Sequence, residues 1–204
     1  MTDQNRHGSR EKVLIAACEM IGEDPASTLS VRAVATRAGV SMGSLRHHFP
    51  TQRALREAVL DTIYTVVAPD NEIIHDRTVP ARDRLVACLR QILAPAVGDQ
   101  ARRAWLTFTD AFLAPEPTDD LRTAYTAMTT EGQRRVEHWL TVLVREGALT
   151  EGDNAVRAGM LNAILTGLSL ERALPNDESV LHRETAILYA GVDAVLGLSA
   201  GTPP

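Results

Sequence analysis

The chain has 204 residues, carries a formal net charge of -5 at pH 7 and is 45% hydrophobic but only 4% aromatic. That length accommodates one domain with a sizeable core, or a small domain joined to a larger one. The net charge argues against a uniformly basic nucleic-acid-binding protein, and no stretch approaches the ~18 uninterrupted apolar residues of a membrane-spanning helix. The polar start MTDQNRHGSREK lacks the apolar core of a secretory signal, so we expect a cytoplasmic protein.

The expected elements begin with a polar arm and a group of short helices. Residues 1–9 are expected to form a loose arm, and apolar residues then recur at helical spacing over 10–21. Two short helices are expected over 30–38 and 42–48. Gly39 lies between them, where the chain needs a left-handed residue to end the first helix.

Polar residues mark where these helices begin and end. Ser30 and Ser41 stand where N-caps are expected, since their hydroxyl oxygens accept hydrogen bonds from free amides of the first turn. Pro50 ends the helix over 42–48. Thr51 then caps a longer fourth helix.

The rest of the chain, from about residue 68, is helical in pattern and shows no strand alternation of any length. The fold class is therefore all-α, with about nine helices. The later helices are expected over 80–93, 99–113, 119–146, 153–174 and 178–198. The two cysteines of the chain, Cys18 and Cys88, stand alone in apolar helical contexts and are interpreted as reduced core residues.

Charge is distributed unevenly, and one window stands out. No Asp or Glu occurs from Pro25 to Arg56, while the same window holds five arginines. Two interpretations fit such a window. The arginines cluster by chance on a solvated face, or they form a positively charged surface that binds phosphate. The second interpretation is favoured because the window contains the segment GVSMGSLRHHFP, residues 39–50.

Two short helices joined by a glycine turn, the second one carrying arginine, are typical of a helix-turn-helix. Val34, Val40, Leu45 and Phe49 are expected to anchor the pair on its neighbours. The other face of the second helix is then free to enter the major groove of DNA. Ser41 and Thr51 lie at helix N-termini, whose free amides bind phosphate.

The segment LSVRAVATRAGVSMGSLRHHFPTQRALREAVL, residues 29–60, resembles the DNA-binding domain of the TetR family of repressors. Two positions depart from the family pattern: Arg46 stands where tyrosine is usual, and Gln52 where lysine is usual. The docking on DNA is expected to survive these changes, while the base preference is put in doubt. The DNA-contacting residues expected from motif and resemblance are Arg32, Ser41, Met42, Gly43, Ser44, Arg46, His47, His48, Thr51, Gln52 and Arg53.

The adjacent histidines His47 and His48 raise two other interpretations, a metal site and a nucleophilic serine with its base. Consecutive helical residues point about 100° apart, so the two rings do not converge on one ion, and no Cys, Asp or Glu lies three or four residues away. A serine nucleophile needs an acidic partner for its base, and the window has none. We therefore expect no enzyme, no metal and no cofactor; His48 remains open to a half-buried structural role.

The resemblance implies that the remainder of the chain is a ligand-binding and dimerisation domain. It is similar to the subgroup that includes choline-responsive betaine-pathway regulators, through the segments RAWLTF, VEHWLTVLVREG and LNAILTGLSLERALP. The implied domains are an arm and helix-turn-helix domain over 1–50, and a linking helix with the helical ligand-binding and dimerisation domain over 51–204.

A dimer is also indicated by spacing in the helix expected over 153–174. Gly159, Ala163 and Gly167 recur every four residues and form a smooth stripe that permits close helix approach. This helix and the last one would form a four-helix interface in a dimer; the alternative is that both pack into the core of one protomer. The expected dimerisation residues are Gly159, Ala163, Ile164, Gly167, Leu168, Leu188, Val192 and Val195.

An effector pocket is suggested by the few aromatic residues, because Trp105, Phe108 and Phe112 fall on one helical face at i, i+3 and i+7. Plain core packing is the alternative. Such a pocket would be apolar with a few polar groups. The expected ligand-binding residues are Tyr64, Trp105, Phe108, Thr109, Phe112, Met128, His138 and Trp139.

The sequence thus predicts a homodimeric, ligand-responsive transcriptional regulator of the repressor type. Its partners would be a palindromic double-stranded DNA operator, with half-sites ~34–36 Å apart, a small-molecule effector that releases it, and a second copy of the chain. No membrane partner is expected. A DNA-binding protein without a ligand and a helical enzyme are the alternatives, and the enzyme would need convergent acid, base or metal groups.

Overall fold

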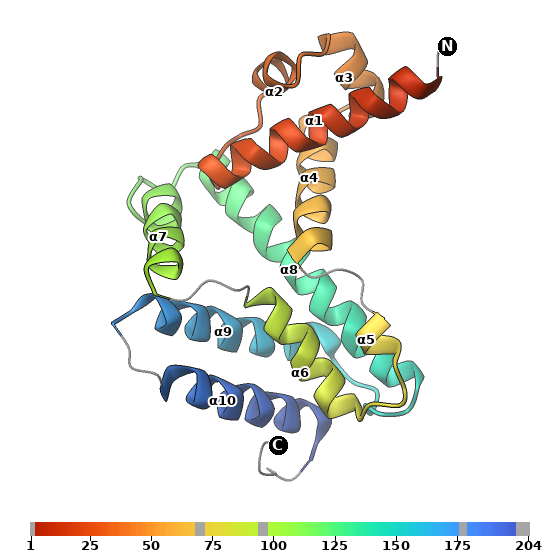
Figure 1. Cartoon of the computed structure of the whole chain (residues 1–204), viewed down its shortest axis with the longest axis vertical. Coiled ribbons are helices and arrows are strands. Elements are labelled where there is room, and N and C mark those ends of the chain that lie inside the picture. The colour runs from red at the N-terminus through yellow and green to blue at the C-terminus, as the bar shows by residue number, and fades with distance from the viewer. Residues whose placement is uncertain (1–2, 68–71, 94–97, 176–178, 199–204) are drawn as a thin grey trace. The chain divides into compact units, whose positions relative to one another are not determined.

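The computed structural model describes residues 3–67, 72–93, 98–175 and 179–198 (Figure 1). Every regular element in these ranges is helical, which confirms the predicted all-α class. Ten α-helices and one π-helical segment follow one another in the described chain. They are α1 (Asp3–Glu23), α2 (Val31–Ala38), α3 (Met42–His48), α4 (Gln52–Val67), α5 (Glu72–His75), α6 (Ala81–Ile92), α7 (Asp99–Phe108), η1 (Thr109–Leu113), α8 (Asp119–Arg145), α9 (Asn154–Ala173) and α10 (Ser179–Leu196).

The chain divides into two compact units. Unit 1 comprises Met1–Val66 and Thr107–Glu131, and unit 2 comprises Val67–Leu106 and Gly132–Pro204. Each unit has its own apolar core.

The first helix is longer than its sequence pattern suggested. Because α1 begins at Asp3, the expectation of a loose arm over 1–9 is wrong from that residue on. A single interior glycine such as Gly8 costs only about 1 kcal/mol relative to alanine.

The core of unit 1 lies where α1, α2 and α3 pack together, with α4 against them. The expected anchors Val34, Leu45 and Phe49 are buried there, and Val40 packs at its edge. The fully or nearly fully buried members are Val13, Leu14, Ala17, Leu29, Val34, Ala35, Leu45, Phe49, Leu55 and Val59.

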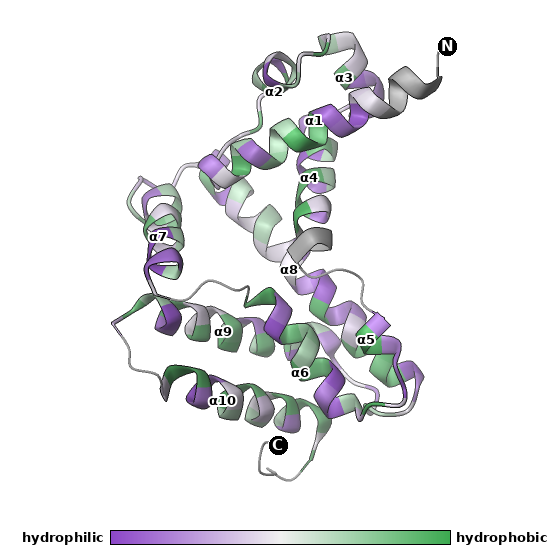
Figure 2. Cartoon of the chain, in the orientation of Figure 1, coloured by the Kyte–Doolittle hydropathy of each residue, from purple (hydrophilic) through white to green (hydrophobic). Residues whose placement is uncertain are grey.

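The core of unit 2 lies mainly among α6, α9, α10 and the later turns of α8, and α5 and most of α7 also belong to this unit. Figure 2 shows apolar residues concentrated along α9 and α10, which pack against each other. Gly191 of α10 is packed closely against α9, because an added Cβ there would lie 2.7 Å from the Ile164 side chain. Main core residues from the four helices are Leu85, Leu89, Trp139, Leu140, Leu161, Leu165, Leu188 and Val192.

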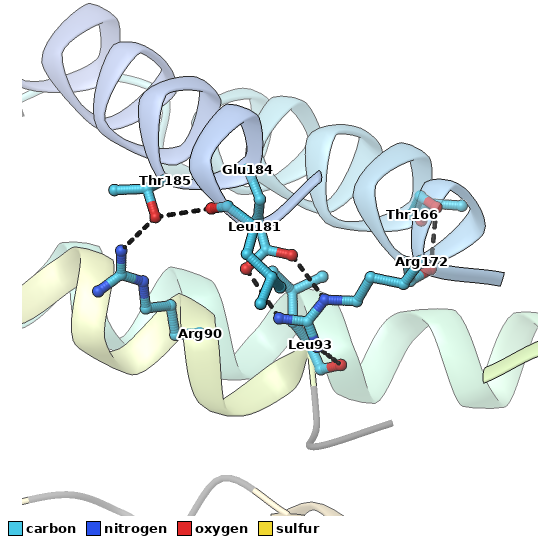
Figure 3. Close-up of polar contacts among 8 residues, drawn as sticks. Arg90, Leu93, Thr166, Arg172, Leu181, Glu184 and Thr185 are labelled. Atoms are coloured by element: carbon cyan, nitrogen blue, oxygen red, sulfur yellow. Dashed lines mark hydrogen bonds and ion pairs between the residues drawn. The ribbon is translucent and has the colours of Figure 1, made fainter. Parts of the chain in front are cut away.

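Four arginine–carboxylate pairs join segments of unit 2 within the described chain, and in three of them both side chains are mostly buried. Arg172 at the end of α9 donates to both oxygens of Glu184 on α10, at 2.5 and 2.7 Å, and to the Leu93 carbonyl at 3.0 Å (Figure 3). The second pair joins Arg82 to Asp193, and the third joins Arg84 to Glu146. Removing one member of such a pair is costly, because the other charge is then left buried without its partner.

No helix among the described residues is long and apolar enough to cross a membrane.

Candidate nucleic-acid interface and effector site

The turn between α2 and α3 is fixed by the residues that the sequence pattern singled out. Gly39 ends α2 with φ at 65°, a left-handed conformation that glycine adopts without a Cβ penalty. The Val40 amide donates to the Ala35 carbonyl at 3.1 Å. Ser41 then caps α3, its hydroxyl oxygen accepting from the Ser44 amide at 3.1 Å.

Helix α3 has one buried face and one exposed face. Leu45 is 0% exposed in the core of unit 1, and the amide of buried Phe49 donates back to the Leu45 carbonyl at 2.8 Å. Met42, Arg46 and His47 are exposed. The geometry matches a helix that is held by one face and presents the other to a groove.

The remaining α3 candidates differ in how far they are exposed. Gly43 is exposed and Ser44 is half-buried. His48 is half-buried, with its ring centroid 5.2 Å from that of His47 and 6.4 Å from that of Phe49. His48 is thus partly packed, as its structural interpretation allowed.

The three expected phosphate contacts at the start of α4 already have different partners within the chain. The Thr51 hydroxyl oxygen accepts from the Ala54 amide at 3.0 Å, the predicted cap. Gln52 donates its side-chain amide to the Thr28 carbonyl, so it ties α4 to the loop before α2. Arg53 pairs with Glu57 at 2.7 Å on the same helix.

The window from Pro25 to Arg56 contains no Asp or Glu and is called the acid-free window. Its five arginines are not equivalent. Arg37 pairs with Glu23 and Glu19 of α1, and Arg56 donates to the Ser27 carbonyl at 2.6 Å. Arg32 and Arg46 are exposed, and no carboxylate of the described residues pairs with either. These two carry positive charge that is available to a partner.

In unit 1, the expected effector residues Phe108 and Phe112 lie together, with ring centroids 5.1 Å apart. They belong to an irregular stretch, since α7 passes into the π-helical η1 and the Ala114 amide donates to the Thr109 carbonyl at 2.8 Å. Such π-helical turns are frequent at functional sites. Tyr125 was not among the predicted residues, yet its ring is 6.4 Å from Phe108 and 5.7 Å from Phe112; its place three residues before Met128 in α8 was the available signal.

Met128 in unit 1 and Trp105 in unit 2 are half-buried. In unit 2, Trp139 is wholly buried in the core, and its indole nitrogen finds no acceptor among the described residues. The neighbouring His138 is exposed. Tyr64 lies outside the residues whose side chains are described. The pocket remains a prediction, with its candidates on several elements.

The expected dimerisation residues fall into two sets. Leu168, Leu188, Val192 and Val195 lie in the core of unit 2, where α9 and α10 pack within the protomer, and Ile164 is half-buried beside them. The small residues Gly159, Ala163 and Gly167 are exposed on α9. The four core residues thus pack within the protomer, and the dimerisation residues remain a prediction.

Within the described ranges, no three His, Cys, Asp or Glu side chains are grouped to hold a metal ion.

Comparisons with known proteins agree with this geometry. Residues 13–59 match the model of the bacterial regulatory proteins of the tetR family, and residues 81–197 match the model of the BetI-type transcriptional repressor C-terminal domain. A comparison with curated protein sequences gave no significant match.

Several solved structures share the fold. A proposed transcriptional regulator of Pseudomonas aeruginosa PAO1 is 24% identical, with a TM-score of 0.52 over 97% of this chain and 92% of that one. NalD, the secondary repressor of the MexAB-OprM multidrug efflux pump in P. aeruginosa, is 20% identical, with a TM-score of 0.51 over 93% and 98%. SmeT in complex with triclosan is 19% identical, with a TM-score of 0.52 over 96% and 97%.

Proposed function

This chain belongs to the TetR family of transcriptional regulators, with a BetI-type C-terminal domain, and from that premise we propose that it is a homodimeric repressor released from a palindromic operator by a small-molecule effector. It would act in the cytoplasm, as a regulator and not as an enzyme. The observation that carries the proposal is that α3 has one buried face and one exposed face. Leu45 holds the helix in the core, while Arg46 is exposed and unpaired within the described chain.

Arg46 is the residue we propose as the main base contact. An arginine on the exposed face of a recognition helix pairs bidentately with guanine in the major groove. Ser41 and Thr51 would bring helix N-termini to the DNA backbone on either side of it. Arg32, Met42, Gly43, Ser44, His47 and His48 are the other proposed contacts, with Gln52 and Arg53 contributing only if their present partners are exchanged for phosphate.

The dimer proposal rests on the exposed surface of α9 and α10. Val156 is 67% exposed and Met160 40% exposed on α9, and Ile187 is exposed on α10. Beside them, Gly159 and Gly167 have open space where a Cβ would stand. Bare apolar residues next to small ones allow a second helix to approach closely and to bury this surface. A dimer then supplies the two helix-turn-helix domains that a palindromic operator requires, one for each half-site.

The effector proposal rests on the cluster of Phe108, Phe112 and Tyr125 in unit 1. It also rests on the domain organisation, which we propose as DNA binding by residues 1–50 and ligand binding and dimerisation by residues 51–204. SmeT shows that a protein of this fold holds triclosan, so we propose an effector of largely apolar character. Effector binding would favour a conformation in which the distance between the two helix-turn-helix domains no longer matches the half-site spacing.

The operator is identified by selecting binders from a random duplex DNA library, which does not require the regulated genes to be known. We expect the selected sequences to share a two-fold symmetric motif. On that motif, Arg46→Ala should lose about 1–3 kcal/mol of specific binding, whereas Arg122→Ala, which removes an exposed arginine at the start of α8, should bind as the wild type does. Selection that yields no common sequence contradicts the repressor proposal.

The dimer and the effector are tested separately. Sedimentation of the wild type should give a dimer, and Met160→Glu should give a monomer because it places a charge in the proposed interface. Leu113→Glu, at an exposed apolar residue of η1, is the matched control. A thermal-shift screen of small molecules that stabilises the protein and lowers its operator affinity supports the effector; a screen without any such molecule favours a DNA-binding protein without a ligand.

A further inference from the structure

Arg10 of α1 lies beside the end of the recognition helix, although it is outside the helix-turn-helix. Its guanidinium carbon is 5.6 Å from the centroid of the Phe49 ring. Phe49 is the residue that caps the C-terminal end of α3. A cation over an aromatic face is held there by the ring quadrupole.

The sequence of α1 explains this position. Val13 and Leu14, three and four residues after Arg10, are buried in the unit 1 core. Residues spaced by three and four share one face of a helix, so Arg10 lies on the same face of α1 as these buried residues, one turn before them. At that turn the face extends beyond the core, and the Arg10 side chain is exposed at the edge of the contact between α1 and α3.

The charge of Arg10 is not neutralised within the described chain, since none of its carboxylates pairs with this guanidinium. Arg37 and Arg53 differ in this respect, because each already has a glutamate partner. Arg10 therefore offers an exposed cation whose direction is restrained by Phe49.

We propose that Arg10 binds the DNA backbone and forms a phosphate contact at the C-terminal end of α3. A seven-residue helix is about 10 Å long, and the major groove is about 12 Å wide. Groups at the two ends of α3 therefore come near the phosphates that border the groove. Ser41 marks one end and Arg10 the other. This inference rests on the proposed function, because the contact requires α3 to lie in the groove.

The contact is tested by the salt dependence of binding. Each phosphate neutralised by a cation contributes about 0.9 to the slope of log K against log salt concentration. Arg10→Ala should reduce the slope by about 0.9 for each protomer on the DNA. Between about 50 and 200 mM KCl, the advantage of the wild type over Arg10→Ala should accordingly shrink by about 3.5-fold per protomer. Fluorescence anisotropy on the selected operator and on a random-sequence duplex of about 30 bp, longer than the half-site spacing, provides both values.

Lys12→Ala is the matched control. Lys12 is an exposed cation two residues further along α1. It lies about 200° around the helix from Arg10, so it points away from the face of α1 that packs on α3. We expect this variant to keep the wild-type slope. A loss equal to that of Arg10→Ala would overturn the proposed contact, because it would show a general effect of charge.

Two further variants separate phosphate binding from a packing role over Phe49. Arg10→Met keeps an apolar side chain over the ring but no charge, and it should lose the same slope as Arg10→Ala. Arg10→Lys should keep the slope. If Arg10→Met retains the wild-type slope, Arg10 only packs and the proposal is overturned. Failure of the proposed function is distinct, since the wild type itself would then show no preference for the selected operator over the random duplex.

Discussion

The pair Arg172–Glu184 provides the sharpest test of what holds unit 2 together, through the substitution Glu184→Gln. The Glu184 side chain is 6% exposed and that of Arg172 is 10% exposed. The pair is bidentate, at 2.5 and 2.7 Å, and Arg172 also donates to the Leu93 carbonyl at the end of α6 (Figure 3). The glutamine keeps the shape of the side chain but removes the charge that neutralises the guanidinium.

The expected loss in the free energy of unfolding is about 3–5 kcal/mol, the usual cost of leaving one member of a buried ion pair without its partner. That is a large part of the roughly 5–15 kcal/mol by which native proteins are stable. With a urea slope of about 1–3 kcal/mol/M, the unfolding midpoint should fall by about 1 M or more.

Urea unfolding followed by tryptophan fluorescence reports on the right part of the chain, because Trp105 and Trp139 both lie in unit 2. Arg90→Gln is the matched control: Arg90 also reaches α10, donating to Thr185 at 2.8 Å, but this contact is exposed. We expect it to leave the midpoint unchanged. A Glu184→Gln midpoint no lower than that of Arg90→Gln would refute the reasoning. Removing both charges, with Arg172→Met and Glu184→Leu together, should cost less than Glu184→Gln alone.

Three further predictions concern single side chains. Leu45→Ala should lower the free energy of unfolding by about 2–5 kcal/mol in chemical denaturation, because it empties a fully buried site. Gly39→Ala should cost about 1–2 kcal/mol at its positive φ, whereas Gly43→Ala, with no close neighbour to its added Cβ, should not destabilise; equal midpoints would contradict this. Burial raises the pKa of the Cys88 thiol to about 12, so alkylation at a pH of about 8, followed by mass spectrometry, should label Cys88 only after unfolding. Labelling of the native protein at a pH of about 8 would contradict this prediction. The same shift contributes stability that is present below the unfolded pKa near 9 and is lost as pH rises towards about 12.

The helix-turn-helix could be predicted in detail because its signals are local. The hydroxyl oxygens of Ser30, Ser41 and Thr51 accept from amides three positions later, and the Gly39 amide donates to carbonyls three and four positions earlier, so a short stretch of sequence contains each cap and the group that it satisfies. The bounds of α2 and α3 followed from these residues. The later helices were also found, since an apolar stripe repeats at the helical period over many turns.

Other features depend on contacts between residues distant in sequence, and no local pattern predicts them. Arg82 and Asp193 pair across 111 positions. The faces of α9 and α10 are both apolar, so periodicity alone did not show that Leu188 and Val192 turn inward while Met160 remains exposed. The four-residue α5 is too short for any period to be recognised. Leu29, with φ at 50° before the cap of α2, carries no sequence signal for that conformation.

The charge of the acid-free window shows why counting arginines overstates an electrostatic footprint. The window holds five arginines, but three of them are already occupied: Arg37 and Arg53 by glutamates and Arg56 by a carbonyl. An arginine with an intramolecular counterion releases fewer ions on binding a phosphate. The unpaired set is instead Arg32, Arg46 and, from outside the window, Arg10. With Arg46 on a base, one phosphate contact from each of Arg10 and Arg32 in a dimer gives a salt slope of about -4, whereas phosphate contacts from all five window arginines would give about -9. The partners of each arginine, and not its position in the sequence, therefore decide how this surface binds DNA.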